Sequence, residues 1–165
     1  MTWTRAGPFL RSLVFLIVAP GSITVLIPWL LLRESRLQPI APVLGYPLIA
    51  AGAAVVLWSF FGFAFFGGGS PAPIDAPRRL VIWGPYRWVR NPMYLGVSTV
   101  LAGELLAFAL SLLPYAALVA GAFYLFVRLY EEPTLTERFG AEYLQYRRRV
   151  PGWLPRPPRE TETQG

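Results

Sequence analysis

Long runs without a charged residue dominate this sequence. One extends from Val43 to Phe66, and another, from Met93 to Gly103, follows a segment rich in arginine. Ser12 to Leu32 is also almost wholly apolar. About 20 consecutive apolar residues are enough for a helix to cross the hydrocarbon core of a bilayer. We therefore expect an integral membrane protein.

Composition supports the same class. Of 165 residues, 55% are hydrophobic and only 15% are charged, which is too apolar for an ordinary soluble domain. Cysteine, histidine and lysine are absent, which excludes disulfides, thiol or imidazole catalysis, zinc sites built on Cys or His, and Schiff bases. The net charge is +6, but the arginines flank apolar runs. Anionic lipid is therefore a simpler partner than nucleic acid.

Four apolar segments predict an all-α, polytopic fold of about four transmembrane helices. They cover residues 12–32, 43–66, 92–111 and 114–130. Pro20-Gly21 predicts a kink in the first helix, because an internal proline removes one backbone hydrogen bond. Gly45, Gly52 and Gly62 should let another helix approach the second one closely. Only Ser111 to Leu113 remain as a turn, so the last two segments should form an antiparallel hairpin.

An amphipathic cytosolic helix is expected to begin at Pro133. Its apolar face repeats at spacings of three and four. This face consists of Leu135, Phe139, Tyr143 and Tyr146. Residues 147–149, all arginine, end the helix, where they can meet lipid headgroups. The expected domains are an N-terminal span and loop over 1–42, a core over 43–155 and a disordered tail over 156–165.

The arginines also predict the orientation. Four spans put both termini on one side of the membrane, together with the segment before the third span. That side collects most arginines, including Arg78 and Arg90, whereas the other has only Arg33 and Arg36, partly offset by Glu34. By the positive-inside rule, both termini are expected in the cytoplasm.

Glu104 lies well inside the third predicted span. An ionisable side chain at such a depth is costly, and by default it marks a functional position in the interior. The structural alternative is a protonated glutamate that bonds to a neighbouring helix. The sequence favours neither.

Arginine and aromatic residues are concentrated from Arg78 to Gly96, in R-R-L-V-I-W-G-P-Y-R-W-V-R-N-P-M-Y-L-G. Pro92 stands where the third helix should begin, a position that its fixed φ suits. The segment could hold a polar ligand at the lipid boundary, or it could be only a positively charged anchor with an aromatic belt.

The loop before it, residues 67–77, lacks the Gly-Lys-Ser/Thr ending of a P-loop and is either a connector or a ligand cover.

Two blocks of the sequence resemble isoprenylcysteine carboxyl methyltransferases and their phospholipid methyltransferase relatives. The first is G-P-Y-R-W-V-R-N-P-M-Y-L-G, and the second is E-E-P-T-L-T-E-R-F-G-A-E-Y-L-Q-Y-R-R-R-V-P-G-W-L-P-R. A helical hairpin separates the blocks, which together reach from Gly84 to Arg156. The resemblance implies an S-adenosylmethionine-dependent methyltransferase in the membrane, with its cofactor beneath the C-terminal helix on the cytosolic side.

The same resemblance implies site residues. The cofactor contacts would be Arg78, Arg79, Leu80, Val81, Tyr86, Asn91, Pro92, Met93 and Tyr94. The substrate-side glutamate would be Glu131, with Glu132 beside it. The family arginine one turn earlier has no equivalent at Val127, and Arg128 is the nearest candidate. Without the resemblance, the two glutamates would be helix-start residues that interact with the helix dipole. Prenylcysteine enzymes usually have histidine at the position of Asn91. Asparagine cannot titrate as a base, so its presence argues against a prenylcysteine substrate.

The chemistry is compatible with this residue inventory. Methyl transfer from a sulfonium needs an aligned nucleophile and few covalent helpers, so no His, Cys, Lys or metal is required. A carboxylate acceptor would react well in a site of low dielectric, whereas a lipid amine must first lose a proton, which Glu131 or Glu132 could accept. We expect transfer to a lipid or lipid-like acceptor at the cytosolic face.

Two other functions stay open. A non-catalytic membrane adaptor or assembly protein would need only the helices and the basic face. A transporter is less favoured, because only Glu104 offers an ionisable group in mid-membrane. The sequence does not indicate an oligomeric state.

Overall fold

The computed structural model describes residues 6–34, 37–62 and 79–158, and every regular element within them is helical. In chain order these are α1 (Ala6–Gly21), η1 (Ser22–Leu26), α2 (Ile27–Leu32), α3 (Pro42–Gly62), η4 (Gly84–Arg87), α4 (Pro92–Ala107), η5 (Leu110–Leu112), α5 (Leu113–Phe126), η6 (Val127–Glu131) and α6 (Glu132–Arg149). Here η marks a π or 3-10 turn. The predicted all-α class is confirmed. The predicted loop over residues 67–77 lies outside the described residues.

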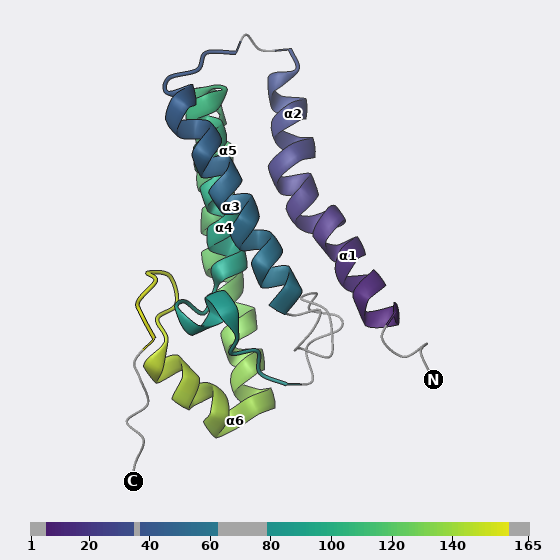
Figure 1. Ribbon diagram of the computed structural model, residues 1–165, viewed down its shortest axis with the longest axis vertical. Coiled ribbons are helices and arrows are strands. Elements are labelled where there is room, and N and C mark those ends of the chain that lie inside the picture. The colour runs from purple at the N-terminus through teal and green to yellow at the C-terminus, as the bar shows by residue number, and fades with distance from the viewer. Residues whose placement is uncertain (1–5, 35–36, 63–78, 159–165) are drawn as a thin grey trace.

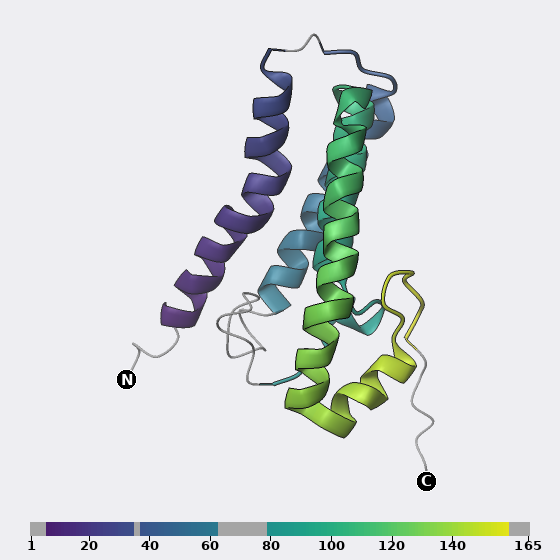
Figure 2. The same ribbon diagram turned by 180° about the vertical axis from the view of Figure 1, so that it is seen from behind.

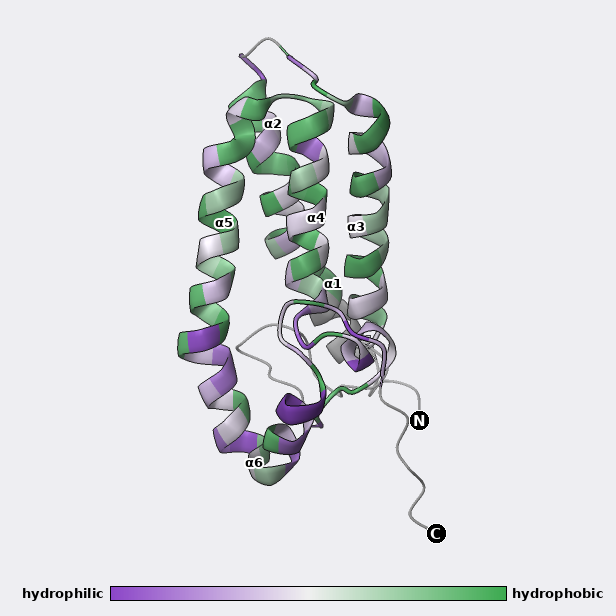
Figure 3. Ribbon diagram, turned by 90° about the vertical axis from the view of Figure 1, so that its left-hand side faces the viewer, coloured by the Kyte–Doolittle hydropathy of each residue, from purple (hydrophilic) through white to green (hydrophobic). Residues whose placement is uncertain are grey.

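Within the described residues, two helices are long and apolar enough to cross a membrane, namely α3 and the helical run from Leu110 to Arg149, which bends at Gly140. Leu16–Leu32 and Pro92–Ala107 are shorter apolar helices, so two of the four predicted spans meet both criteria. The third is shorter than predicted because the chain leaves helical geometry at Phe108. Figure 3 shows hydrophobic residues along α3, α4 and α5, and hydrophilic residues gathered around α6.

α3 and α4 pack with their backbones in contact. A Cβ atom on Gly52 would lie 2.6 Å from the carbonyl oxygen of Gly96, and one on Gly45 would lie 2.7 Å from that of Gly103. Because any larger residue would collide with backbone here, these four glycines set the spacing of the two helices. The predicted close approach is confirmed at Gly45 and Gly52. Gly62 instead faces the segment before α4.

The N-terminal helix changes direction at the π turn η1, directly after the predicted kink at Pro20-Gly21 (Figure 1). Ile27 donates its N–H five residues back instead of to Ile23, and Pro28 has no N–H to offer. The carbonyl oxygen of Ile23 is therefore left for the Tyr115 hydroxyl of α5, which donates to it at 2.7 Å. This bond holds the N-terminal helix against the bundle.

A second π turn, η6, joins α5 to α6 in one continuous helix. α6 does begin at Glu132, close to the predicted start at Pro133, but it is not a separate helix. The wide turn accommodates a proline without an N–H, as η1 does before Pro28. The chain turns back instead at Gly140, where φ is 50° and ψ is −122° (Figure 2). Glycine adopts a positive φ at little cost.

Two apolar clusters organise the bundle. The larger one joins α3, α4 and α5 through Val56, Val97, Leu101 and Val119. The N-terminal helix packs against it. The smaller cluster lies under the last arm of α6. At that same end lie the start of α1 and the segment before α4 (Figure 1).

Candidate active site

The segment before α4 is held by the residues that follow α6. Asn91, at the N-cap of α4, makes no side-chain capping bond; its amide instead donates to the carbonyl oxygen of Gly152 at 3.1 Å. The backbone N–H of Arg90 donates to the carbonyl oxygen of Pro151 at 2.8 Å. The two blocks singled out in the sequence are therefore in direct contact.

The last arm of α6 covers the same segment. The Tyr146 hydroxyl donates to the carbonyl oxygen of Tyr86 at 2.8 Å. Arg156 donates its backbone N–H to the carbonyl oxygen of Trp88 at 3.0 Å, so the predicted tail begins with a hydrogen-bonded residue. The predicted apolar face of α6 is confirmed. Its cluster contains Leu80, Leu135, Phe139, Tyr143, Tyr146 and Val150.

Glu132 is the centre of an arginine cluster. Arg90 donates to its Oε1 at 2.8 Å, and Arg128 donates to its Oε2 at 3.0 Å. Arg147 lies 3.6 Å from the same Oε2. The Glu132 side chain is only 8% exposed. Burial alone would raise its pKa, but the bond and charge of Arg90, with help from Arg147 and Arg128, hold the pKa below its ordinary value.

Glu131 faces α4 rather than the arginine cluster. The Tyr94 hydroxyl donates to its Oε2 at 2.8 Å, and the Tyr94 ring lies against Phe123, with 4.8 Å between centroids. The pKa of Glu131 is raised above its ordinary value, mainly because the side chain is buried. The hydrogen bond from Tyr94 lowers this pKa, the charge of Glu132 raises it, and the charge of Arg90 lowers it. Adjacent carboxylates with opposite pKa shifts are typical of sites that move protons.

The structure brings some of the predicted cofactor residues to this site. Val81, Tyr86, Asn91, Pro92 and Met93 are buried, and Leu80 and Tyr94 are half-buried. Burial, followed by the charge of Glu131, raises the pKa of the Tyr86 phenol well above its ordinary value. Arg79 is exposed, and Arg78 lies outside the described residues.

Sequence reasoning missed two parts of the site. Arg90 was not predicted as a site residue, yet it also donates to the Tyr143 hydroxyl at 3.0 Å and to the carbonyl oxygen of Val150 at 3.1 Å. The contact of Gly152 with Arg90 and Asn91 was also missed. The available signal was the run R-N-P at the helix start, because a buried arginine needs a carboxylate partner elsewhere in the chain.

Glu104 does not belong to this site. It lies 13 residues along α4 from Asn91, which corresponds to about 20 Å in a helix. Its side chain is 6% exposed, and its Oε2 has no hydrogen-bond partner within the described residues. Neither predicted role of Glu104 is tested by these contacts.

A family model described as phospholipid methyltransferase matches residues 40–142, which is more than half of the chain. The chain belongs to the phospholipid methyltransferase family. The predicted relationship is therefore confirmed. Neither the curated proteins nor the solved structures give a match to this chain.

The phospholipid methyltransferase match includes Tyr94, Glu131 and Glu132. It begins just before α3 and ends before Tyr143. This is a family of membrane methyltransferases whose members generally use S-adenosylmethionine. The N-terminal helix therefore lies outside the matched region. So do the residues after α6 in the chain that contact Arg90, Val150 and Pro151.

Proposed function

We propose that this protein is an integral membrane S-adenosylmethionine-dependent methyltransferase that methylates the amine of a phospholipid headgroup. The observation that carries the proposal is the 2.8 Å contact between Tyr94 and Glu131. It joins the two sequence blocks on which the resemblance to methyltransferases depends. It lies at the end of the apolar helices, where a lipid headgroup would be found.

The residues around this contact suit the proposed cofactor. S-adenosylmethionine carries a cationic sulfonium and, when bound, supplies the methyl group. The aromatic rings of Tyr86 and Tyr94 favour such a cation. Leu80, Val81 and Asn91 complete the segment that would hold it. The last arm of α6 covers this segment and keeps water away from it.

Glu131 would act as the proton acceptor for the amine. A phospholipid amine is an ammonium at neutral pH and has no free electron pair until one N–H bond breaks. That proton would pass to a carboxylate oxygen of Glu131, and the electron pair would remain on nitrogen for the new N–C bond. The bond between the methyl group and the sulfur of the cofactor would break, and its electron pair would stay on the neutral thioether that leaves. Tyr94 holds the carboxylate in place, and the raised pKa of Glu131 makes it a stronger base than an ordinary glutamate.

The proposed topology has four membrane crossings with both termini in the cytoplasm. α3 and the helix from Leu110 onward are long enough to cross. The N-terminal helix and α4 run beside them over much of the same height (Figures 1 and 2). The ends of the bundle also differ in charge. Arg90, Arg128 and residues 147–149 lie at the α6 end, which the positive-inside rule places in the cytoplasm.

Transfer of a radiolabelled methyl group tests the proposal. The purified protein, in nanodiscs that contain phosphatidylethanolamine, should label that lipid, and Glu131→Gln should lower the rate about 10²-fold or more if Glu131 is the base. Glu142→Gln, an exposed residue of α6, should keep the rate of the unchanged protein. Calorimetry should show that Glu131→Gln still binds S-adenosylmethionine and that Asn91→Ala binds it more weakly.

The other functions give different results in the same assay. Labelling of a prenylated cysteine but not of phosphatidylethanolamine would assign a carboxylate acceptor. Cofactor binding without any labelled lipid would point to a non-lipid acceptor. An adaptor would neither bind the cofactor nor transfer the methyl group. Full activity of Glu131→Gln would remove this residue from the mechanism.

A further inference from the structure

We infer that a pocket in the bend of α6 binds the phosphodiester group of a phospholipid through Arg128 and Arg147, an inference that rests on the proposed lipid substrate. We call it the elbow pocket. It has a volume of about 580 Å³ and is lined by Arg128, Glu132, Pro133, Thr136, Glu137 and Arg147. No role for this pocket follows from the contact between Tyr94 and Glu131.

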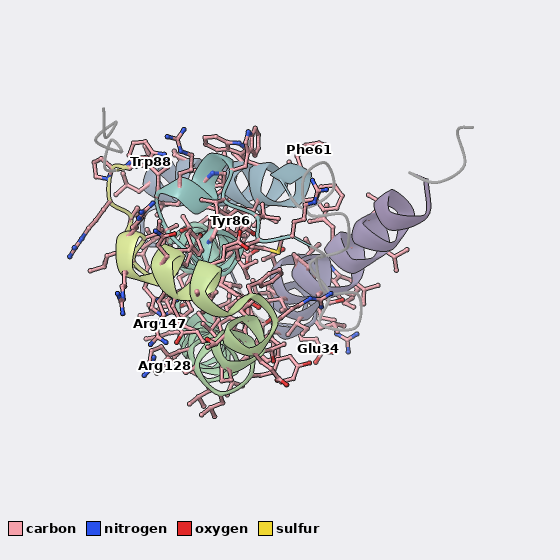
Figure 4. The ribbon with its side chains drawn as sticks, turned by 90° about the horizontal axis from the view of Figure 1, so that it is seen from below. Glu34, Phe61, Tyr86, Trp88, Arg128 and Arg147 are labelled. Atoms are coloured by element: carbon pink, nitrogen blue, oxygen red, sulfur yellow. The ribbon has the colours of Figure 1, made fainter. Side chains whose placement is uncertain are left out.

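The elbow pocket exists because α6 folds back on itself. All of its lining residues except Arg147 come from the first arm of α6 or the turn before it. The positive φ of Gly140 returns the second arm, which brings Arg147 to Glu132. Figure 4 shows Arg128 and Arg147 next to each other on the same side of the molecule.

The elbow pocket has two arginines, Arg128 and Arg147, and two carboxylates, Glu132 and Glu137, and the buried Arg90 behind Glu132 adds one further positive charge. Glu132 faces three guanidinium groups, and the buried Arg90 already occupies its Oε1. Arg128 and Arg147 share the remaining oxygen, and their side chains are 50% and 40% exposed. A guanidinium has five N–H donors, and at 3.6 Å Arg147 makes no hydrogen bond to Glu132. Donors therefore remain for a phosphate, which arginine binds well.

The depth of Arg128 fits a lipid headgroup rather than a phosphate in solution. It follows directly on the apolar part of the helix, which ends at Val127. Leu125 and Leu129, on the turn around it, are 56% and 75% exposed, as acyl-chain contacts would require. Arg128 and Glu131 are three residues apart in the same short π turn, η6, from which Glu131 faces α4. The short ethanolamine linker could then place the amine at the proposed base.

Equilibrium binding without the cofactor tests the elbow pocket. The probe is a short-chain phosphatidylethanolamine, dihexanoyl phosphatidylethanolamine, titrated into the full-length protein in detergent. Because each guanidinium would lose charge-assisted hydrogen bonds to the phosphate, Arg128→Gln and Arg147→Gln should each weaken binding about tenfold or more. Arg148→Gln, on the next and exposed residue, is the matched control and should bind like the unchanged protein.

Two further ligands identify what is recognised. Dihexanoylglycerol, which lacks the phosphate, should bind weakly and equally to all variants. Inorganic phosphate should bind more weakly than the lipid, and equal affinity would assign the pocket to free phosphate. Unchanged lipid binding in both folded arginine variants would overturn the inference. If Arg128→Gln does not fold, Arg128→Lys and Arg147→Gln still decide it, because Lys keeps the charge but loses the guanidinium donors.

The two proposals fail in different ways. Arginine-dependent lipid binding without methyl transfer would leave the elbow pocket standing and would contradict the proposed enzyme. Methyl transfer with an unchanged KM for phosphatidylethanolamine in both arginine variants would support the proposed enzyme and would contradict the elbow pocket as the lipid phosphate site. Affinity for S-adenosylmethionine should be the same in all these variants.

Discussion

Arg90 and Glu132 lie 42 positions apart in the chain and form an ion pair of 2.8 Å in which both side chains are nearly buried. Arg90 immediately precedes the N-cap of α4, and Glu132 begins α6. Their contact therefore fixes the start of one helix against another. Glu131, the adjacent residue, is thereby held beside Tyr94.

Arg90→Gln should be strongly destabilising. The substitution leaves Glu132 in a buried place without its closest cation, a loss that typically costs about 3–5 kcal/mol. Thermal unfolding in detergent should show a clear drop in Tm. Arg33→Gln is the matched control, because its pair with Glu34 is exposed, at 51% and 83%, and should contribute at most about 1 kcal/mol. Equal Tm values for the two variants would contradict the assigned importance of the buried pair.

Gly52→Ala and Gly121→Ala should change stability in opposite directions. A Cβ atom on Gly52 would lie 2.6 Å from the Gly96 carbonyl oxygen, and backbone cannot move aside easily. Overpacking of this kind costs about 1–3 kcal/mol. Gly121 has no atom within 4 Å of its Cβ position, so alanine there should stabilise the helix by about 1 kcal/mol. The Tm of each variant measures this, and a raised Tm for Gly52→Ala would contradict the packing of α3 on α4.

The parts of the fold that depend on local sequence were predicted well. Apolar runs gave the helices, and small residues gave the close approach at Gly45 and Gly52. The π turns were not predictable from hydrophobicity. They depend on how a missing N–H at Pro28 or Pro133 is accommodated, and a wider turn and a helix break are both physically possible. The bend at Gly140 was missed for a different reason, because a helix pattern continues on both sides of it.

The site was only partly predictable for a different reason. Resemblance pointed to Tyr94 and Glu131 one residue at a time, and the structure adds that they are partners. The role of Glu132 depends on Arg90 and Arg147, which come from separate parts of the chain. Hydrophobic periodicity along the sequence does not predict such pairs, because their members are far apart in the chain. Charge spacing along α6 could suggest only the local pair of Arg128 and Glu132.

The proposed topology predicts opposite compartments for two reporter fusions. A reporter fused after Arg36 should lie outside the cytoplasm, and one fused after Gly165 should lie inside it. Alkaline phosphatase and green fluorescent protein fusions at both positions give complementary signals. A third fusion within residues 67–77 should behave like the C-terminal one. If the fusions after Arg36 and Gly165 report the same compartment, four crossings are wrong.

Stability should fall in acid through Glu132. Its folded pKa lies below the ordinary value of 4.5, so folding favours its ionised form. This contribution is complete above pH 4.5 and is lost as the pH falls through the lower folded pKa. The Tm advantage of the unchanged protein over Glu132→Gln should therefore shrink below that pH. Glu142→Gln, which is exposed, should show no such change. A constant difference down to low pH would contradict the ion-pair assignment.

The pH dependence of methyl transfer should depend on Tyr94. A base must be ionised, so activity should fall as the pH drops through the folded pKa of Glu131, which lies above the ordinary 4.5. The Tyr94 hydroxyl lowers this pKa, so Tyr94→Phe should raise it further and move the acid limb of kcat to higher pH. Tyr130→Phe, which removes an exposed phenol one residue before Glu131, should leave the limb in place. Rates of labelled methyl transfer at saturating cofactor and lipid provide the measurement. An acid limb at the same pH in Tyr94→Phe would mean that a group other than Glu131 accepts the proton.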